Sequence, residues 1–129
     1  MDVFVYGTLT DPDRAAAVVE DARFLGAARL VGLHDVEGRY PTLAPGGSTT
    51  GRILRTDDVE GLDAYEGVEG GLYVRVTVPR ADGSTVETYV GDPVRLGIAD
   101  AVTWPGDDPF PDRVATYVDR NEVVVRPDG

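Results

Sequence analysis

Residues 72–90 constrain the fold most, because they contain two extended segments on either side of a tight turn. From Leu72 to Val78 the large apolar side chains fall at every second position, which is the period of a strand with one buried face. Asp82-Gly83 is typical of a hairpin turn, and Thr85–Val90 supplies the returning strand. We therefore expect an antiparallel β-hairpin in this part of the chain.

Short elements separated by turns account for the rest of the chain. Further strands are expected at residues 3–6, 23–37, 51–55 and 123–125, and helices at residues 12–20, 58–66 and 112–121. Residues 40–47 and most of 92–112 are expected to be loop, because Pro and Gly interrupt both stretches. Strands outnumber helices, and 16 glycines supply the corners that a curved sheet needs. With no internal repeat, residues 1–129 are expected to form one domain.

The charge of the chain excludes two classes of partner. Its 23 acidic residues against 12 arginines, with no lysine, give a formal net charge of −11. Such a surface repels nucleic acids and anionic membranes, so neither is expected as a partner. Two explanations stay open: adaptation to concentrated salt, which screens self-repulsion, and a GC-rich codon bias that replaces Lys by Arg. The acid excess favours a halophilic protein, since codon bias does not account for it.

Composition also limits the chemistry and the location. The chain has no cysteine, which excludes a disulfide framework, a thiolate nucleophile and a zinc–thiolate site. Its acidic residues match no calcium-loop spacing, so no metal is expected. The chain has no apolar run of about 18 residues and no leader-like start, so we expect a cytoplasmic protein. No feature indicates an oligomeric state.

Glu66 is the main candidate for a functional residue, because its position conflicts with its charge. It lies at the end of the expected helix 58–66, for which Asp57 is a good N-cap. At about 100° per residue, Glu66 falls roughly 20° from Val59, within the apolar stripe that Val59 and Leu62 define. The dipole at a helix C-terminus also disfavours a negative charge. The alternative stays open that Glu66 is one of many solvated carboxylates, since so short a helix can be irregular.

The turn after the first strand is the second candidate. In Tyr6-Gly7-Thr8-Leu9 the glycine lets the backbone turn sharply, so that the N–H groups of residues 7–9 can point into one space. Such a group of amides binds anions or a developing oxyanion. A simple turn without a function is the alternative explanation.

Four other side chains have weaker claims. Tyr73 and Arg75 share the hairpin face opposite the valines; Tyr73 can hydrogen-bond a substrate or the candidate carboxylate, whereas Arg75 is expected to form a structural ion pair. His34, the only histidine, is expected at the surface or paired with the neighbouring aspartate. Trp104 is expected to anchor a loop rather than to form a stacking platform.

Four short motifs follow one another between about residues 3 and 90. They are Val5-Tyr6-Gly7-Thr8-Leu9, Arg39-Tyr40-Pro41-Thr42-Leu43, Gly51-Arg52-Ile53-Leu54, and Leu62-Asp63-Ala64-Tyr65-Glu66-Gly67 continued by Gly71-Leu72-Tyr73-Val74-Arg75-Val76-Thr77-Val78. In content and order they resemble the γ-glutamylcyclotransferase-like family. Its pattern is Tyr-Gly-Ser/Thr-Leu, Tyr-Pro, Gly-x-Ile/Val and Leu-Asp-x-x-Glu-Gly…Gly-x-Tyr-x-Arg-x-x-Val.

The resemblance implies both a fold and a reaction. The fold is α+β, a small mixed β-barrel with a few flanking short helices and a cavity at the barrel mouth. The reaction converts a γ-glutamyl amine or γ-glutamyl peptide to 5-oxoproline and a free amine by intramolecular cyclisation, without a cofactor. Glu66 would be the general acid–base, with a pKa raised by burial and by the helix C-terminus. The residues assigned to substrate binding are Tyr6, Gly7, Thr8, Leu9 and Tyr73.

A non-catalytic module that captures a small carboxylate or amine metabolite at the barrel mouth is the alternative function. Catalysis requires Glu66 to lie in one concave pocket with the amides of residues 7–9, although about 57 residues separate them. The basic residues that the extra carboxylates of glutathione would need are not evident. We therefore expect the reaction class, with a γ-glutamyl small molecule as the substrate, and leave the identity of that substrate open.

Overall fold

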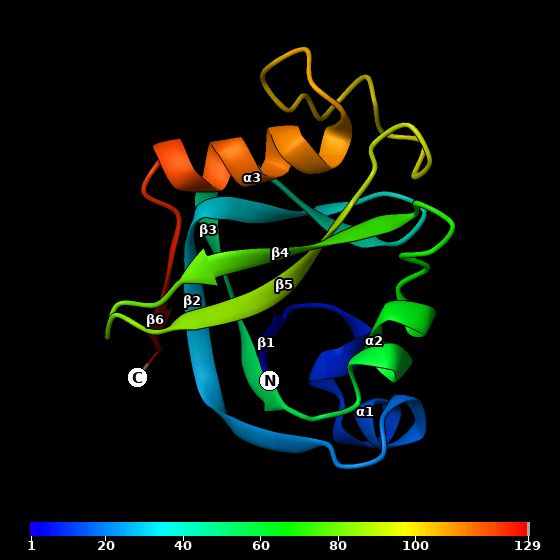
Figure 1. The fold of residues 1–129 in the computed structure, drawn as a ribbon, viewed down its shortest axis with the longest axis vertical. Coiled ribbons are helices and arrows are strands. Elements are labelled where there is room, and N and C mark those ends of the chain that lie inside the picture. The colour runs from blue at the N-terminus through cyan, green and yellow to red at the C-terminus, as the bar shows by residue number, and fades with distance from the viewer. Residues whose placement is uncertain (129) are drawn as a thin grey trace.

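The computed structural model describes residues 1–128, which are built around one mixed β-sheet (Figure 1). The sheet contains β1 (Asp2–Val5), β2 (Arg23–Glu37), β3 (Pro41–Arg55), β4 (Tyr73–Pro79), β5 (Thr85–Gly91) and β6 (Val124–Pro127). The helices are α1 (Pro12–Val18), α2 (Val59–Tyr65) and α3 (Phe110–Arg120), with one short 3₁₀ turn, η1 (Thr8–Thr10). The described residues therefore have the expected α+β fold.

The sheet is curled rather than flat. Its strand order is β4–β5–β1–β3–β2–β6, with β1 parallel to β5 and antiparallel to β3. A parallel bridge joins Arg80, just after β4, to Val125 in β6, so the two edges of the sheet approach each other. The result is a six-stranded half-barrel, in agreement with the expected barrel architecture.

Strand β1 lies at the centre of the sheet and is buried on both faces. Phe4 points into the larger core, which α3 covers through Val114, whereas Val3 and Val5 point into a second core with Leu62 of α2. Figure 1 shows α3 across the upper end of the sheet, and α1 and α2 together at its lower right. The chain that follows β1 is therefore held between the sheet and these two short helices.

The hairpin predicted at residues 72–90 is confirmed. Strands β4 and β5 pair antiparallel, and Gly83 in the connecting turn has a φ of 91°, which favours glycine. Trp104 is also placed as expected, because it is 2% exposed and packs edge-on against Phe110 and Tyr117. His34 hydrogen-bonds through Nδ1 to the Gly46 carbonyl at 2.9 Å and not to the neighbouring aspartate.

The loop predicted at residues 40–47 is wrong, because β3 begins at Pro41 and continues to Arg55. Pairing with β2 supplies the reason: Leu33–Glu37 pair with Pro41–Pro45. Proline is tolerated as the first residue of a strand. Gly46 and Gly47, further along β3, lie opposite the irregularity in the pairing between Val31 and Leu33 of β2.

Several element ends also differ from the prediction. Strand β1 stops at Val5 and leaves Tyr6 in the turn, and α1 ends at Val18 instead of Glu20. Helix α3 begins two residues early, at Phe110, and the last strand is Val124–Pro127 instead of residues 123–125.

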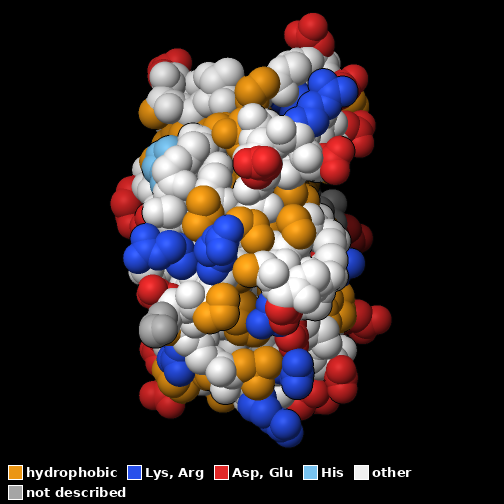
Figure 2. All heavy atoms as spheres, turned by 90° about the vertical axis from the view of Figure 1, so that its left-hand side faces the viewer, with side chains coloured by type: hydrophobic (Ala, Val, Ile, Leu, Met, Phe, Trp, Pro, Cys, Tyr) orange, Lys and Arg blue, Asp and Glu red, His pale blue; other side chains and the backbone are white. Residues whose placement is uncertain are grey.

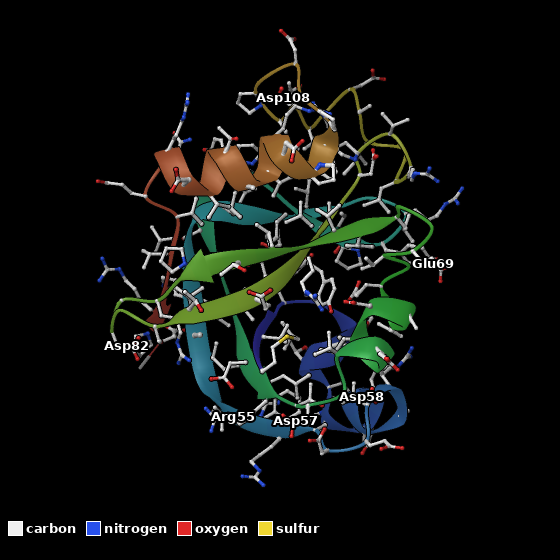
Figure 3. The ribbon with its side chains drawn as sticks, viewed as in Figure 1. Arg55, Asp57, Asp58, Glu69, Asp82 and Asp108 are labelled. Carbon is white, nitrogen blue, oxygen red and sulfur yellow. The ribbon has the colours of Figure 1, made fainter. Side chains whose placement is uncertain are left out.

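Asp58 caps α2, and not Asp57 as predicted. Its carboxylate accepts hydrogen bonds from the amides of Gly61 at 2.9 Å and Glu20 at 3.3 Å, which ties the start of α2 to the end of α1. Figure 3 shows both aspartates in this region, at the lower end of the molecule.

The surface is polar and charged in large part. On the face drawn in Figure 2, apolar side chains lie in small groups among arginines, acidic residues and polar atoms. Among the helices of residues 1–128, none has both the length and the apolar character needed to cross a bilayer.

Candidate active site

One cavity of about 400 Å³ brings together all six residues that the sequence assigns to a site. It opens beside the end of β1 and takes its walls from η1, α1, α2, β4, β5 and the turn between β2 and β3. The six residues are Tyr6, Gly7, Thr8, Leu9, Glu66 and Tyr73. Segments that lie far apart in the sequence therefore meet here, as a shared substrate would require.

Glu66 forms the C-cap of α2, directly after the last helical residue. Its backbone N–H donates to the Leu62 carbonyl at 3.0 Å, so the helix sets the position of the side chain. The side chain is partly buried, and in the described residues no arginine lies within 4 Å of its carboxylate. Burial without a compensating charge raises the pKa of Glu66 to about 7.

The turn at residues 7–9 lines the same cavity. Gly7 is the N-cap of η1, and the first backbone bond of this turn runs from Thr10 N to the Gly7 carbonyl at 3.1 Å. The N–H groups of Gly7, Thr8 and Leu9 precede that bond, and no backbone carbonyl within residues 1–128 pairs with them. Successive backbone N–H groups without a partner are the kind of donors that bind an anion or an oxyanion.

Three tyrosines complete the inner wall, and each hydroxyl is held in place. Tyr6 donates to the Tyr89 carbonyl at 2.6 Å, Tyr73 donates to the Pro41 carbonyl, and Tyr89 donates to the Asp63 carboxylate at 2.7 Å. Burial raises the pKa of all three, and the charge of Glu66 adds to the effect at Tyr6 and Tyr73. All three stay neutral near pH 7, so Glu66 is the group among them that can exchange a proton.

The hydroxyl of Tyr73 does not point its proton at Glu66, which was one of the two roles expected for it. It lies in the cavity wall and keeps an oxygen lone pair with which to accept a hydrogen bond. Arg75 forms the ion pair that was expected, with Asp63 at 3.1 Å and with Glu87 at 3.6 Å.

Sequence reasoning did not assign to the site four residues with polar side chains that also line the cavity: Arg14, Tyr40, Tyr65 and Tyr89. Tyr65 precedes Glu66 directly, and its hydroxyl lies 2.6 Å from Thr8 Oγ1, which joins α2 to the η1 turn. Tyr40 belongs to the Tyr-Pro motif, which was available as a signal. Arg14 and Tyr89 reach the cavity only through the packing of α1 and β5, for which the local sequence carries no sign.

A family model and a curated relative, compared with this chain, both carry an AIG2-like description. Residues 3–104 match the family model described as Gamma-glutamyl cyclotransferase, AIG2-like. AIG2-like protein A of Arabidopsis thaliana is 37% identical over 102 residues, which cover 69% of this chain and 60% of that protein. The chain thus spans about 60% of the length of this curated relative.

Solved structures show the same fold. A structure described as gamma-glutamyl cyclotransferase superposes with a TM-score of 0.61 at 16% identity, covering 91% of this chain and 97% of the other. A solution structure of an Arabidopsis thaliana protein has a TM-score of 0.58 at 33% identity, covering 86% of this chain and 78% of the other.

Proposed function

The chain belongs to the gamma-glutamyl cyclotransferase, AIG2-like family, and on this basis we propose that it converts a γ-glutamyl amine or γ-glutamyl peptide to 5-oxoproline and a free amine. The observation that carries the proposal is the position of Glu66. A carboxyl group with a pKa of about 7 shares a small cavity with three unpaired backbone amides. A proton carrier and an oxyanion site are the two groups that this cyclisation needs.

In the proposed reaction, ionised Glu66 takes a proton from the α-ammonium group of the substrate. The freed nitrogen attacks the γ-carbonyl carbon, and the carbonyl electron pair moves to the oxygen, which accepts hydrogen bonds from the amides of residues 7–9. As the carbonyl re-forms, the bond to the leaving amine breaks. Two protons leave the attacking nitrogen in all and two reach the leaving amine, and Glu66 carries them one at a time.

The cavity supports this chemistry in two further ways. The new bond forms within one substrate molecule, so holding the γ-glutamyl group in a bent conformation supplies much of the rate. The inner wall of neutral tyrosines offers polar but uncharged contacts for the ring that forms. Tyr6 and Tyr73 are the two tyrosines of this wall whose pKa is raised by the charge of Glu66. Because the pKa of Glu66 lies near 7, both its ionised and its protonated forms are accessible at neutral pH.

The test is release of 5-oxoproline from a panel of γ-glutamyl amino acids, γ-glutamylamines and glutathione, in both low and molar salt. General acid–base catalysis contributes about 10²–10⁴-fold, so Glu66→Gln should reduce turnover by that order while the folded protein still binds substrate. Glutamine keeps the shape of the side chain but cannot accept the ammonium proton.

Glu69→Gln is a matched control, because it removes the same charge three residues further on. Figure 3 shows Glu69 in the loop after α2, directed outward, and this residue does not line the cavity. Its turnover should equal that of the wild type. If the wild type binds γ-glutamyl ligands but forms no product from any of them, the domain is the small-metabolite binding module instead.

A further inference from the structure

The cavity has an inner and an outer part, which differ in exposure. Its floor is formed by buried residues, among them Phe4, Val5 and Tyr89. Its rim carries Tyr40 and Tyr65, which are 52% and 38% exposed. If the γ-glutamyl half lies against Glu66 and the turn amides, the leaving amine must extend toward this rim.

Arg14 is the one cationic side chain among the described residues that line the cavity. It lies on α1 directly before Ala15, which is fully buried and anchors the helix to the core. Arg14 itself is exposed, and within residues 1–128 no carboxylate lies within 4 Å of its guanidinium. Arg29, Arg55, Arg75 and Arg80 are each paired with an acidic residue, and among the other arginines of residues 1–128 Arg14 is the one that lines the cavity.

An unpaired arginine at a cavity is notable in a chain with a net charge of −11. The molecule as a whole repels anionic ligands, so a local cation strengthens binding where one must bind. A guanidinium is suited to this task because its planar fork of N–H donors matches the two oxygens of a carboxylate.

We propose that Arg14 is a specificity-determining residue that binds one carboxylate on the leaving amine, so that γ-glutamyl amino acids are the preferred substrates. This inference rests on the proposed function. One cation selects one carboxylate, which distinguishes an amino acid from an uncharged amine. The cavity volume of about 400 Å³ lies near the lower end of the range of ligand pockets, about 300–1,000 Å³, and favours a compact leaving group.

The experiment compares γ-glutamylalanine with γ-glutamylalaninamide, which differ only in the carboxylate of the leaving group. Wild-type kcat/KM should favour the acid by about five-fold, the size of an ion pair at a solvent-exposed site. In Arg14→Gln the ratio of the two kcat/KM values should fall to near one, and in Arg14→Lys it should be intermediate. Raising KCl to 1 M should shrink the wild-type ratio, since salt screens exposed pairs, but not that of Arg14→Gln.

Arg120→Gln is the matched control for the loss of one positive charge. Arg120 is exposed in the last turn of α3 and does not line the cavity, so this variant should keep the wild-type ratio. The inference is overturned if Arg14→Gln keeps the preference for the acid, or if the wild type has none. It is also overturned if Arg14→Gln weakens both substrates equally, because Arg14 would then hold the γ-glutamyl half.

A failure of the proposed function can be distinguished from a failure of the inference about Arg14. If no substrate releases 5-oxoproline, calorimetric binding of the same two ligands to Glu66→Gln, with and without Arg14→Gln, still tests the role of Arg14. Tighter binding of the acid that depends on Arg14 supports the inference without catalysis. Equal binding of both ligands, or binding of neither, overturns it.

Discussion

At the scale of single residues, Glu66 combines two properties that conflict. Its backbone is fixed at the end of α2, which keeps the carboxyl group partly out of water, and no cation in the described residues offsets its charge. Ionisation therefore costs free energy in the folded state, and burial raises the pKa to about 7. The same cost that suits the group to proton transfer must weaken the fold.

We expect Glu66→Gln to stabilise the protein at alkaline pH. Below the ordinary pKa of 4.5 the carboxyl is protonated in both the folded and unfolded states, and variant and wild type should have equal stability. Between pH 4.5 and 7 the unfolded chain ionises first, so the wild type loses stability as the pH rises. At pH 8 the variant should be more stable by up to about 3 kcal/mol, since each pKa unit corresponds to about 1.4 kcal/mol.

Urea unfolding of both proteins at pH 4 and pH 8 measures this difference. Glu69→Gln removes an exposed carboxylate and should match the wild type at both values. A Glu66→Gln variant that is less stable than the wild type at pH 8 would show that the ionised carboxylate has a stabilising partner.

At the scale of elements, α2 depends on its neighbours for its structure. A helix of seven residues is too short to be stable alone, so contacts outside it must hold it in place. Leu62 is fully buried, Tyr65 reaches Thr8 on the η1 turn, and Asp63 accepts hydrogen bonds from Tyr89 and Arg75. The position of the candidate catalytic group is therefore set jointly by the turn and by the β4–β5 hairpin.

We expect the contact between Asp63 and Tyr89 to contribute more than the one between Asp63 and Arg75. Tyr89 is 3% exposed, so Asp63→Ala leaves a buried hydroxyl without an acceptor and should lower the free energy of unfolding by about 2 kcal/mol. Arg75 is exposed, and Arg75→Ala should cost less than about 1 kcal/mol. Asp63→Ala removes both contacts, so the excess of its loss over that of Arg75→Ala, measured by chemical denaturation, gives the contribution of the Tyr89 contact. Equal losses would assign the stabilisation to the ion pair.

How far the elements could be predicted depends on whether their signals were local. The β4–β5 hairpin was predictable because strict alternation and a turn dipeptide lie within 20 residues. The first half of β3 was not predictable, because its prolines and glycines are typical of a loop; these are Pro41, Pro45, Gly46 and Gly47. Its strand structure depends on pairing with β2, which no local pattern reveals.

The candidate site shows the same division. Glu66 was predictable because its charge conflicts with its place on a helix, and the turn at residues 7–9 because a glycine follows a buried strand. The family pattern strengthened both predictions. Arg14 and Tyr89 were not predictable, because an arginine on a short helix and a tyrosine in a strand acquire their positions only when distant segments pack.

At the scale of the whole molecule, negative charges outnumber positive charges. The chain carries 23 acidic residues against 12 arginines, and several of those arginines are already engaged with carboxylates. The remaining acidic groups repel one another across the surface. Screening this repulsion should outweigh the weakening of the exposed ion pairs, because the excess of negative charge is large.

We expect the protein to gain stability when KCl is raised from 0.05 M to 1 M at pH 8. A gain of about 1 kcal/mol, or roughly 4 °C in Tm for a domain of this size, is the expected order of magnitude. The increment should vanish near pH 4.3, the isoelectric point of the sequence, where the net charge is lost. Calorimetry at the two salt concentrations and two pH values decides, and a fall in Tm with salt at pH 8 would contradict the expectation.

The central place of β1 in the sheet affects when this strand can fold during synthesis of the chain. This strand precedes both of its sheet neighbours in the chain: Asp2 bonds to Arg55, 53 residues on, and the Phe4 carbonyl accepts from Thr88, 84 residues on. Strand β1 can pair with β3 once Arg55 has been synthesised, but its other edge stays unpaired, and open to wrong partners, until β5 has been synthesised. The turn that carries the candidate amides follows β1 directly, so it takes up its working form only after segments far downstream in the chain have been made.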